Sequence, residues 1–149
     1  MTDFRQLSAQ VWASPQITLA EVGEAAALGF RAIVNNRPEG ESADQTAGDA
    51  IADAARAAGM AYHAIPITHA GFSEAQALAM AAILKQEAGP ILAYCRSGTR
   101  STLLWALARA SRGADPAELS EAAGAAGYDL GPVAPALTML AERARNSAA

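Results

Sequence analysis

The stretch that decides the fold is Pro90-Ile91-Leu92-Ala93-Tyr94-Cys95-Arg96-Ser97-Gly98-Thr99-Arg100-Ser101, and it holds the only cysteine of the chain. Its first five residues form a short apolar run, which is typical of a buried strand. The residues that follow, 102–108, are dense in good helix formers. We therefore expect a strand over 90–94, a tight turn, and a helix that begins at Ser101.

This turn places Cys95 next to the N-terminus of the expected helix. Backbone N–H groups point outward at such an end and the helix dipole is positive there, so an anion is stabilised. The same field favours the thiolate form of a cysteine, which is its nucleophilic form. Arg100 adds a guanidinium that can bind an oxyanion through two N–H groups, and Ser101 adds a helix-start hydroxyl that could donate to the thiolate. The segment predicts cysteine-based group transfer with an anionic substrate.

Strand and helix signals alternate on both sides of this segment. Two capping boxes, Thr18 with Glu21 and Ser73 with Gln76, mark helix starts, and Asp115 precedes a proline at the first position of another helix. The alternation predicts an α/β fold, a small and mostly parallel sheet flanked by helices, built as one domain over residues 1–149. The expected strands cover 10–13, 31–35, 61–67 and 90–94, and the expected helices cover 18–28, 46–58, 73–87, 101–111, a segment after Asp115, and a segment from about residue 133.

Composition narrows the possible partners. The net charge is −4 and no block of lysine or arginine stands out, so nucleic acid is not expected as a partner. One cysteine excludes an internal disulfide and a cysteine-rich metal site, and it fits a reducing compartment. No apolar stretch is long enough to span a bilayer. We expect a cytoplasmic protein without a metal, cofactor or membrane partner, and the sequence leaves a homo-oligomer open.

The cysteine loop has the pattern Cys-x-x-Gly-x-Arg-Ser. It resembles the loop of dual-specificity phosphatases, Cys-x-x-Gly-x-x-Arg-Ser, which is one residue longer. It matches outright the loop Cys-Arg-Ser-Gly-x-Arg-Ser of single-domain rhodaneses, but the Asp-Val-Arg and Gly-His-Ile-Pro-Gly-Ala stretches of rhodaneses are absent. Residues 28–37 are instead similar to a phosphatase segment in which a helix, a glycine and a strand end in Asn-Leu-Arg. Residues 61–67 are similar to the phosphatase strand that leads into the general-acid loop.

Taken as a whole, the chain resembles the phosphatase-like domain family that occurs alone or fused to metallo-β-lactamase-type and sulfur-oxidising enzymes. The resemblance covers nearly all of the chain and implies a dual-specificity-phosphatase-like fold. It is carried by Pro15-Gln16-Ile17, by Asn36-Arg37-Pro38-Glu39-Gly40-Glu41, by the Cys95 loop with Leu103-Leu104-Trp105-Ala106, and by Ala126-Gly127-Tyr128-Asp129-Leu130.

The general acid implied by this resemblance is missing. Dual-specificity phosphatases have an aspartate in the loop that follows the strand over 61–67, whereas this loop reads Thr68-His69-Ala70-Gly71-Phe72. His69 falls close to the position of the missing aspartate, and a histidine can protonate a leaving oxygen near neutral pH. An exposed loop histidine without a role is the equal alternative.

The remaining candidates would bind the substrate. Gly98 allows the backbone to turn its N–H group inward and form a nest for an anion. The other loop residues, Arg96, Ser97 and Thr99, join it as candidates. Arg37, Glu39 and Glu41 follow a different strand and could line the same cleft. For Arg96 solvation alone is the alternative, and for Arg37 ordinary turn chemistry explains the segment as well.

Three functions remain open at this point. In the first, the Cys95 thiolate attacks the phosphorus of a phosphate ester, on an anionic small molecule or a phosphoprotein, and a cysteinyl-phosphate forms that water then removes. In the second, a rhodanese-like sulfurtransferase, Cys95 carries a persulfide, and the short loop surrounds a single sulfur more closely than a phosphate. In the third, the domain binds phosphate or sulfate groups without turnover. The first is our leading expectation because most of the chain supports it.

Overall fold

The structure is a computed structural model and describes residues 2–148. Its sheet has the strand order β1-β2-β5-β3-β4. Strands β2, β5, β3 and β4 run parallel to one another. Strand β1 lies at the edge of the sheet and is antiparallel to β2. The strands are β1 (Arg5–Gln6), β2 (Val11–Ser14), β3 (Ala32–Asn35), β4 (Ala61–Ala64) and β5 (Ile91–Tyr94).

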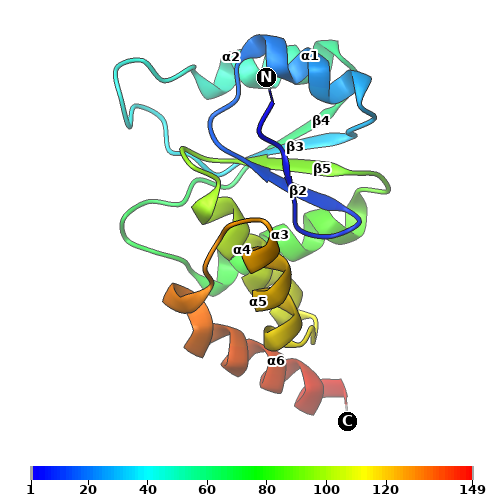
Figure 1. Cartoon of the computed structure of the whole chain (residues 1–149), viewed down its shortest axis with the longest axis vertical. Coiled ribbons are helices and arrows are strands. Elements are labelled where there is room, and N and C mark those ends of the chain that lie inside the picture. The colour runs from blue at the N-terminus through cyan, green and yellow to red at the C-terminus, as the bar shows by residue number, and fades with distance from the viewer. Residues whose placement is uncertain (1, 149) are drawn as a thin grey trace.

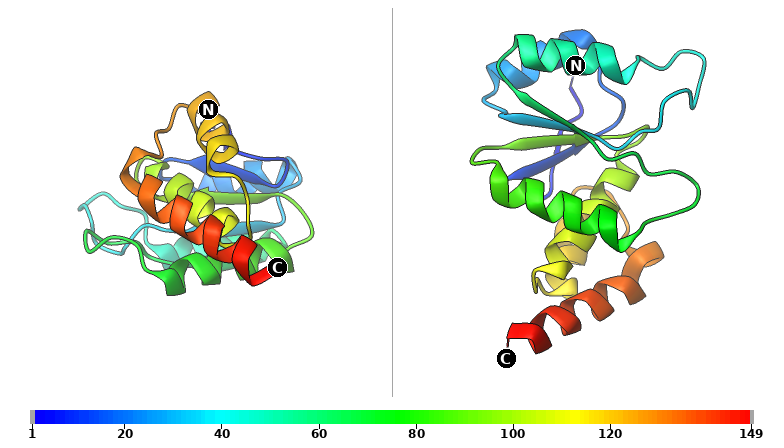
Figure 2. Two further views of the ribbon diagram at one scale, coloured as in Figure 1. Left: turned by 90° about the horizontal axis from the view of Figure 1, so that it is seen from below. Right: turned by 180° about the vertical axis from the view of Figure 1, so that it is seen from behind.

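Helices cover both faces of this sheet (Figures 1 and 2). In Figure 1, α1 and α2 lie above the sheet, and α3 to α6 lie below it. A 3₁₀ turn, η1 (Gly131–Val133), leads into the last helix. The helices are α1 (Leu19–Ala27), α2 (Gly48–Ala57), α3 (Glu74–Gln86), α4 (Thr99–Ser111), α5 (Pro116–Ala125) and α6 (Ala134–Ala148).

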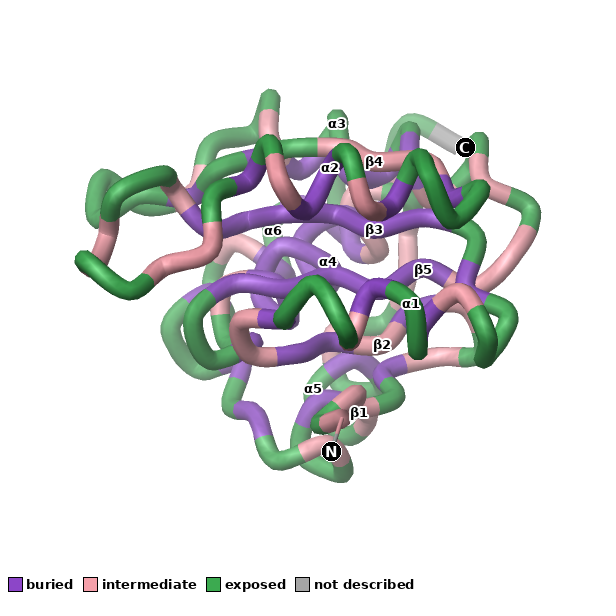
Figure 3. The backbone as a smooth tube through the Cα atoms, turned by 90° about the horizontal axis from the view of Figure 1, so that it is seen from above, coloured by how far each residue is buried: buried purple, intermediate pink, exposed green. Residues whose placement is uncertain are grey.

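The position of β5 at the centre of the sheet explains why its sequence is apolar without interruption. Ile91 and Ala93 pack into the core shared with α3 to α6, whereas Leu92 and Tyr94 pack into the core shared with α1 and α2. Successive side chains of a strand point to opposite faces, so a strand covered on both sides needs apolar residues at every position. Figure 3 shows β2, β3, β5 and α4 as the buried centre of the molecule. The predicted α/β fold is confirmed.

The predicted helix starts are confirmed by their caps. Thr18 and Glu21 form a reciprocal capping box, in which the Glu21 N–H donates to Thr18 Oγ1 at 3.1 Å. Ser73 and Gln76 form the same box at the start of α3. Asp115 accepts a hydrogen bond from the N–H of residue 117, ahead of the proline that opens α5. Local hydrogen bonds therefore fix these helix ends as the sequence predicts.

The main differences from the prediction are one strand end, one additional strand and two helix starts. The strand expected over 61–67 is regular only to Ala64 as β4, although the N–H groups of Ile65 and Ile67 still donate to the Asn35 and Asn36 carbonyls at 2.9 Å. β1 was not predicted, since two residues are too few for a periodic signal. α4 begins at Thr99 instead of Ser101, and α2 begins at Gly48, two residues later than expected.

The topology brings the ends of three strands together. Tyr94, the last residue of β5, is in register with Ser14 of β2 and with Asn35 of β3. The residues after these strands therefore meet at one edge of the sheet, where open α/β sheets bind ligands. In Figure 1 the loops that follow β3, β4 and β5 all leave the sheet on its left side. Within residues 2–148, no helix is both long and apolar enough to cross a membrane.

Candidate active site

The Cys95 loop closes around its own sulfur atom. The N–H of Gly98 donates to Cys95 Sγ at 3.1 Å, and the N–H of Cys95 donates to the Ser14 carbonyl at 3.3 Å. Gly98 is the N-cap of α4 and has φ = +94°, a conformation that favours glycine. Cys95 itself is buried, with 0% of its surface exposed. The loop thus aims a backbone donor at the sulfur.

Arg100 is held against this loop by Glu41. Arg100 Nη1 donates to Glu41 Oε2 at 2.7 Å, Nη2 donates to Oε1 at 2.9 Å, and Nη1 also donates to the Ile67 carbonyl at 2.8 Å. The hydrogen bonds from Arg100, followed by the one from Arg37, lower the pKa of Glu41 to about 2 against the opposing effect of burial. The same pairing with Glu41, with the Cys95 sulfur as a smaller contribution, raises the pKa of Arg100 above its ordinary value. Both groups of the pair are therefore charged at neutral pH.

Arg37 lies behind Glu41 and does not line the cleft, although the sequence placed it among the substrate-binding candidates. Only 4% of its side chain is exposed. Its Nε donates to Glu41 Oε1 at 2.9 Å, and its two terminal nitrogens donate to Gln16 Oε1 and Ser42 Oγ. Arg37 thus fixes the carboxylate that fixes Arg100.

The Ser101 hydroxyl was expected to donate to the thiolate, but the structure gives it another partner. Its hydroxyl donates to Asn36 Oδ1 at 2.7 Å, and Asn36 Nδ2 donates to the Ile65 carbonyl at 3.0 Å. A serine hydroxyl has one proton, so this bond uses its only donor. Both side chains are fully buried. Ser101 therefore joins α4 to the segments after β3 and β4.

An open cleft of about 500 Å³ lies at this edge of the sheet. It brings together three predicted site residues, Arg96, Arg100 and His69. Cys95 is buried and is not one of the residues that line the cleft. Ser97 and Thr99 are outside the lining as well, and their exposed hydroxyls bond each other at 3.0 Å. The lining consists of Pro38, Glu39, Gly40, Glu41, Thr68, His69, Arg96 and Arg100.

The two carboxylates of the cleft are already engaged by the protein. Glu41 binds Arg100, and Glu39 Oε1 accepts a hydrogen bond from the N–H of Gly48 at 2.6 Å. This bond caps α2, whose N-cap residue Ala47 has no side chain that could do so. Apart from these glutamates and the two arginines, His69 is the remaining ionisable side chain of the lining. It is therefore the candidate proton donor.

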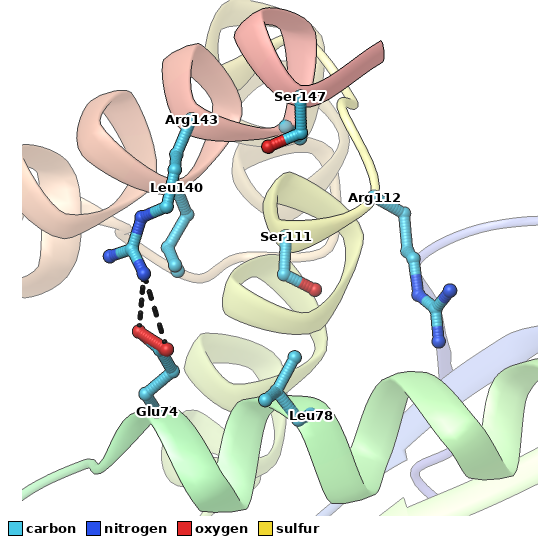
Figure 4. A pocket seen from close by; sticks show the side chains of 8 residues that line it. Glu74, Leu78, Ser111, Arg112, Leu140, Arg143 and Ser147 are labelled. Carbon is cyan, nitrogen blue, oxygen red and sulfur yellow. Dashed lines mark hydrogen bonds and ion pairs between the residues drawn. The ribbon is translucent and has the colours of Figure 1, made fainter.

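A second cavity, of about 310 Å³, lies between α3, α4 and α6. Figure 4 shows its ion pair, in which Arg143 Nη1 binds Glu74 Oε1 at 2.8 Å. None of its lining residues belongs to the Cys95 loop. The chemistry-bearing residues therefore gather at the first cleft.

Sequence reasoning named Glu41 only as a residue that could line the cleft, which it does, and gave Tyr128 no part in the site. Glu41 binds Arg100, and Tyr128 Oη donates to the Ser97 carbonyl at 3.2 Å. Both lie in the segments 36–41 and 126–130, which carried the family resemblance, so the signal was present without a role attached to it.

Comparison with known sequences gives a consistent result. The sequence profile of the beta-lactamase hydrolase-like protein, phosphatase-like domain, matches residues 3–112. The beta-lactamase hydrolase-like protein of Xylella fastidiosa (strain Temecula1) is 39% identical over 104 residues, and that of Agrobacterium fabrum is 36% identical over 98 residues. These alignments cover 69% and 66% of this chain but only 24% and 23% of the relatives. The chain thus spans about a quarter of the length of the curated relatives that it matches.

Comparison with solved structures extends the match to the fold. The crystal structure of a candidate phosphatase from Neisseria meningitidis has a TM-score of 0.82 and 31% sequence identity, and the alignment covers 94% of this chain and 99% of that chain. The structure of PTPMT1 in complex with PI(5)P has a TM-score of 0.75 at 14% identity, covering 98% and 99% of the two chains, which shows a shared fold alone. With its sequence profile and its fold in agreement, the chain belongs to the family of phosphatase-like domains of beta-lactamase hydrolase-like proteins.

Proposed function

We propose that this domain hydrolyses phosphate monoesters through a covalent intermediate on Cys95. The family and the fold are those of phosphatases. The Cys95 thiolate would attack phosphorus, so that an S–P bond forms while the bond between phosphorus and the leaving oxygen breaks. Water would then attack the cysteinyl-phosphate, releasing inorganic phosphate and restoring the thiolate.

The observation that carries this proposal is the way in which Arg100 is held. A guanidinium has five N–H donors, and the bonds to Glu41 and Ile67 use three of them among the described residues. Nε–H and one Nη2–H are left for the oxygens of a substrate. Because Glu41 holds the far edge of the guanidinium, these two donors are oriented before the substrate arrives, and a preoriented donor pair stabilises the charge of the transition state.

His69 would supply the proton that the leaving oxygen needs. It shares the cleft with Arg96 and Arg100, whereas Glu39 and Glu41 are bound elsewhere. An alkyl alkoxide is a poor leaving group without a proton, and an aryl oxide is a good one. We therefore expect His69→Ala to slow hydrolysis of an alkyl phosphate about 10²-fold while changing that of 4-nitrophenyl phosphate less than threefold.

The other histidine provides the matched control. His63 lies on β4 and its Nε2 is 3.0 Å from Glu87 Oε2, outside the cleft lining. His63→Ala should leave the ratio of alkyl to aryl hydrolysis unchanged. If His69→Ala loses the same activity with both substrates, His69 is not the proton donor. That result would not affect the assignment of Cys95 as the nucleophile.

Sulfur transfer is the second candidate, favoured by the tightness of the loop. The Gly98 N–H reaches Sγ directly at 3.1 Å, and the sulfur is fully buried. This enclosure suits a persulfide, which adds one atom to the thiolate. The test is to incubate the protein with thiosulfate and cyanide beside the phosphate esters. Cys95-dependent formation of thiocyanate without ester hydrolysis would replace our proposal with this one.

A further inference from the structure

The peptide unit between Ser97 and Gly98 is held at both ends. Its N–H group, on Gly98, donates to Cys95 Sγ at 3.1 Å. Its carbonyl, on Ser97, accepts a hydrogen bond from Tyr128 Oη at 3.2 Å. The N–H and C=O groups of a planar trans peptide point in opposite directions. One rigid unit therefore joins the Tyr128 hydroxyl to the sulfur of Cys95.

The end of α5 explains how Tyr128 reaches this position. Gly127 has φ = +93° and reverses the chain after the helix. The N–H of Tyr128 donates to the Ala123 carbonyl at 2.9 Å and the N–H of Gly127 donates to the Gly124 carbonyl at 3.0 Å, the two bonds of a Schellman motif. This motif directs the Tyr128 side chain back toward the start of α4.

Arg5 fixes the ring of Tyr128 from the other side. Its guanidinium carbon lies 5.3 Å from the ring centroid, and its Nη1 donates to the carbonyl of residue 126 at 3.3 Å. Burial, opposed by the Arg5 charge, raises the pKa of Tyr128 above its ordinary value of 10.0. The hydroxyl is therefore protonated at neutral pH and can donate to the Ser97 carbonyl.

The contact with Tyr128 requires that residue 98 has no side chain. A methyl group built on Gly98 would collide with the Tyr128 hydroxyl, so the tyrosine occupies the space that any other residue at the N-cap of α4 would need. The positive φ of Gly98 and the close approach of Tyr128 are thus two parts of one arrangement. Together they constrain the orientation of the Ser97–Gly98 peptide.

We propose that Tyr128 is a positioning residue that holds the Ser97–Gly98 peptide so that its N–H group faces the Cys95 sulfur. The catalytic part of this assignment rests on the proposed function. Tyr128 lies outside residues 3–112, which the family profile matches. The segment after α4 thus contributes to the reactive loop as well as to the core.

The test is Tyr128→Phe, which removes the hydroxyl and keeps the ring on Arg5. Hydrogen exchange of the Gly98 amide, followed by NMR on ¹⁵N-labelled protein, should become about fivefold faster or more, the factor expected for one hydrogen bond. With 4-nitrophenyl phosphate, kcat should fall about five- to tenfold with KM changed less than twofold, because the lost orientation acts on the nucleophile.

Ser111→Ala is the matched control, since its hydroxyl also donates to a backbone carbonyl, that of Ala108 at 2.6 Å, away from the loop. It should leave both measurements unchanged. Unchanged Gly98 exchange in Tyr128→Phe would overturn the proposal. Faster exchange with an unchanged kcat would overturn its catalytic part. If the wild-type protein hydrolyses no ester, the proposed function fails, while the exchange measurement still decides whether Tyr128 holds the peptide.

A second variant covers the case in which Tyr128→Phe does not fold. Arg5→Gln removes the cation from the tyrosine ring and keeps the hydroxyl. Gly98 exchange should accelerate in this variant too, by about twofold or more, because a cation–π contact from the partly exposed Arg5 is weaker than the hydrogen bond that it supports. No acceleration in Arg5→Gln would contradict the role given to the Arg5 contact.

Discussion

Glu41 binds Arg100 through both of its carboxylate oxygens, at 2.7 and 2.9 Å. The two residues come from different parts of the sequence, since Glu41 follows β3 and Arg100 lies in the first turn of α4. Arg37 supports the same carboxylate from behind at 2.9 Å. This relationship makes the geometry of the arginine depend on a loop that is remote in sequence, and the first two predictions test it.

Glu41→Gln should weaken catalysis more than folding. A neutral amide cannot accept two bonds from Arg100 while it also faces Arg37, so the guanidinium loses its fixed orientation. We expect kcat/KM for 4-nitrophenyl phosphate to fall about 10- to 100-fold. The midpoint temperature of thermal unfolding should fall by a few degrees, roughly 2–4 °C for each 1 kcal/mol lost from the free energy of unfolding.

Glu74→Gln is the control for this change. Glu74 also binds an arginine through both oxygens, Arg143 at 2.8 and 3.2 Å, but this pair is exposed and lies in the second cavity (Figure 4). Exposed pairs contribute about 0.2–1 kcal/mol. The control should retain wild-type activity, and a similar loss in both variants would argue against a special role for Glu41.

The same carboxylate predicts the pH dependence of stability. The pKa of Glu41 is lowered from 4.5 to about 2, first by the hydrogen bonds from Arg100. A carboxylate with a depressed folded-state pKa stabilises the protein above its unfolded-state pKa, and this stabilisation disappears as the pH falls through the folded-state value. The free energy of unfolding should therefore decline between about pH 4.5 and pH 2 because of this group.

Urea unfolding at several pH values measures this effect. The wild-type protein should lose on the order of 1–3 kcal/mol more than Glu41→Gln over that interval, since the variant has no group to protonate at this position. Parallel curves for the two proteins from pH 5 to pH 2 would show that Glu41 does not titrate in the predicted window.

Arg100→Lys should remove nearly all activity while the fold is kept. Lysine retains the positive charge but cannot bind Glu41 and two substrate oxygens in one plane. We expect kcat/KM to fall at least about 10²-fold. Arg143→Lys, at the exposed pair with Glu74, is the matched control and should be active. An Arg100→Lys protein with most of the wild-type activity would contradict the proposed binding of substrate oxygens by Arg100.

Asn36→Ala should reduce stability strongly. Asn36 is fully buried, and its loss leaves the Ser101 hydroxyl and the Ile65 carbonyl without their partners. Unpaired buried polar groups cost about 1–3 kcal/mol each, so we expect a loss of roughly 2–4 kcal/mol in the free energy of unfolding. Asn146→Ala, on an exposed position of α6, should change it by less than about 0.5 kcal/mol.

The sequence predicted those features that depend on neighbouring residues. The capping boxes at Thr18 and Ser73, the buried strand before Cys95 and the glycine turn at Gly98 are all encoded within a few positions. Alternating strands and helices of ordinary length then leave few topologies other than a parallel sheet. The fold class and the position of the Cys95 loop followed from these local signals.

The sequence did not predict which polar groups would meet across the fold. Arg37 and Glu41 stand four positions apart, yet only the fold shows that Glu41 spans to Arg100 and that Arg37 supports it. Ser101 was expected to serve the thiolate and instead binds Asn36. Such pairings depend on the register of β3 and β5 and on the loop after β3, and no local periodicity specifies them.

The most direct test of the proposed function is the covalent state of Cys95 during turnover. The protein is mixed with excess 4-nitrophenyl phosphate, quenched in acid and measured by intact-protein mass spectrometry, with Cys95→Ser treated in the same way. We predict a phosphoryl adduct on Cys95 in the wild-type protein and neither adduct nor 4-nitrophenol release in Cys95→Ser. Ester hydrolysis that persists in Cys95→Ser, or a wild-type protein that forms only a persulfide with thiosulfate, would contradict the account.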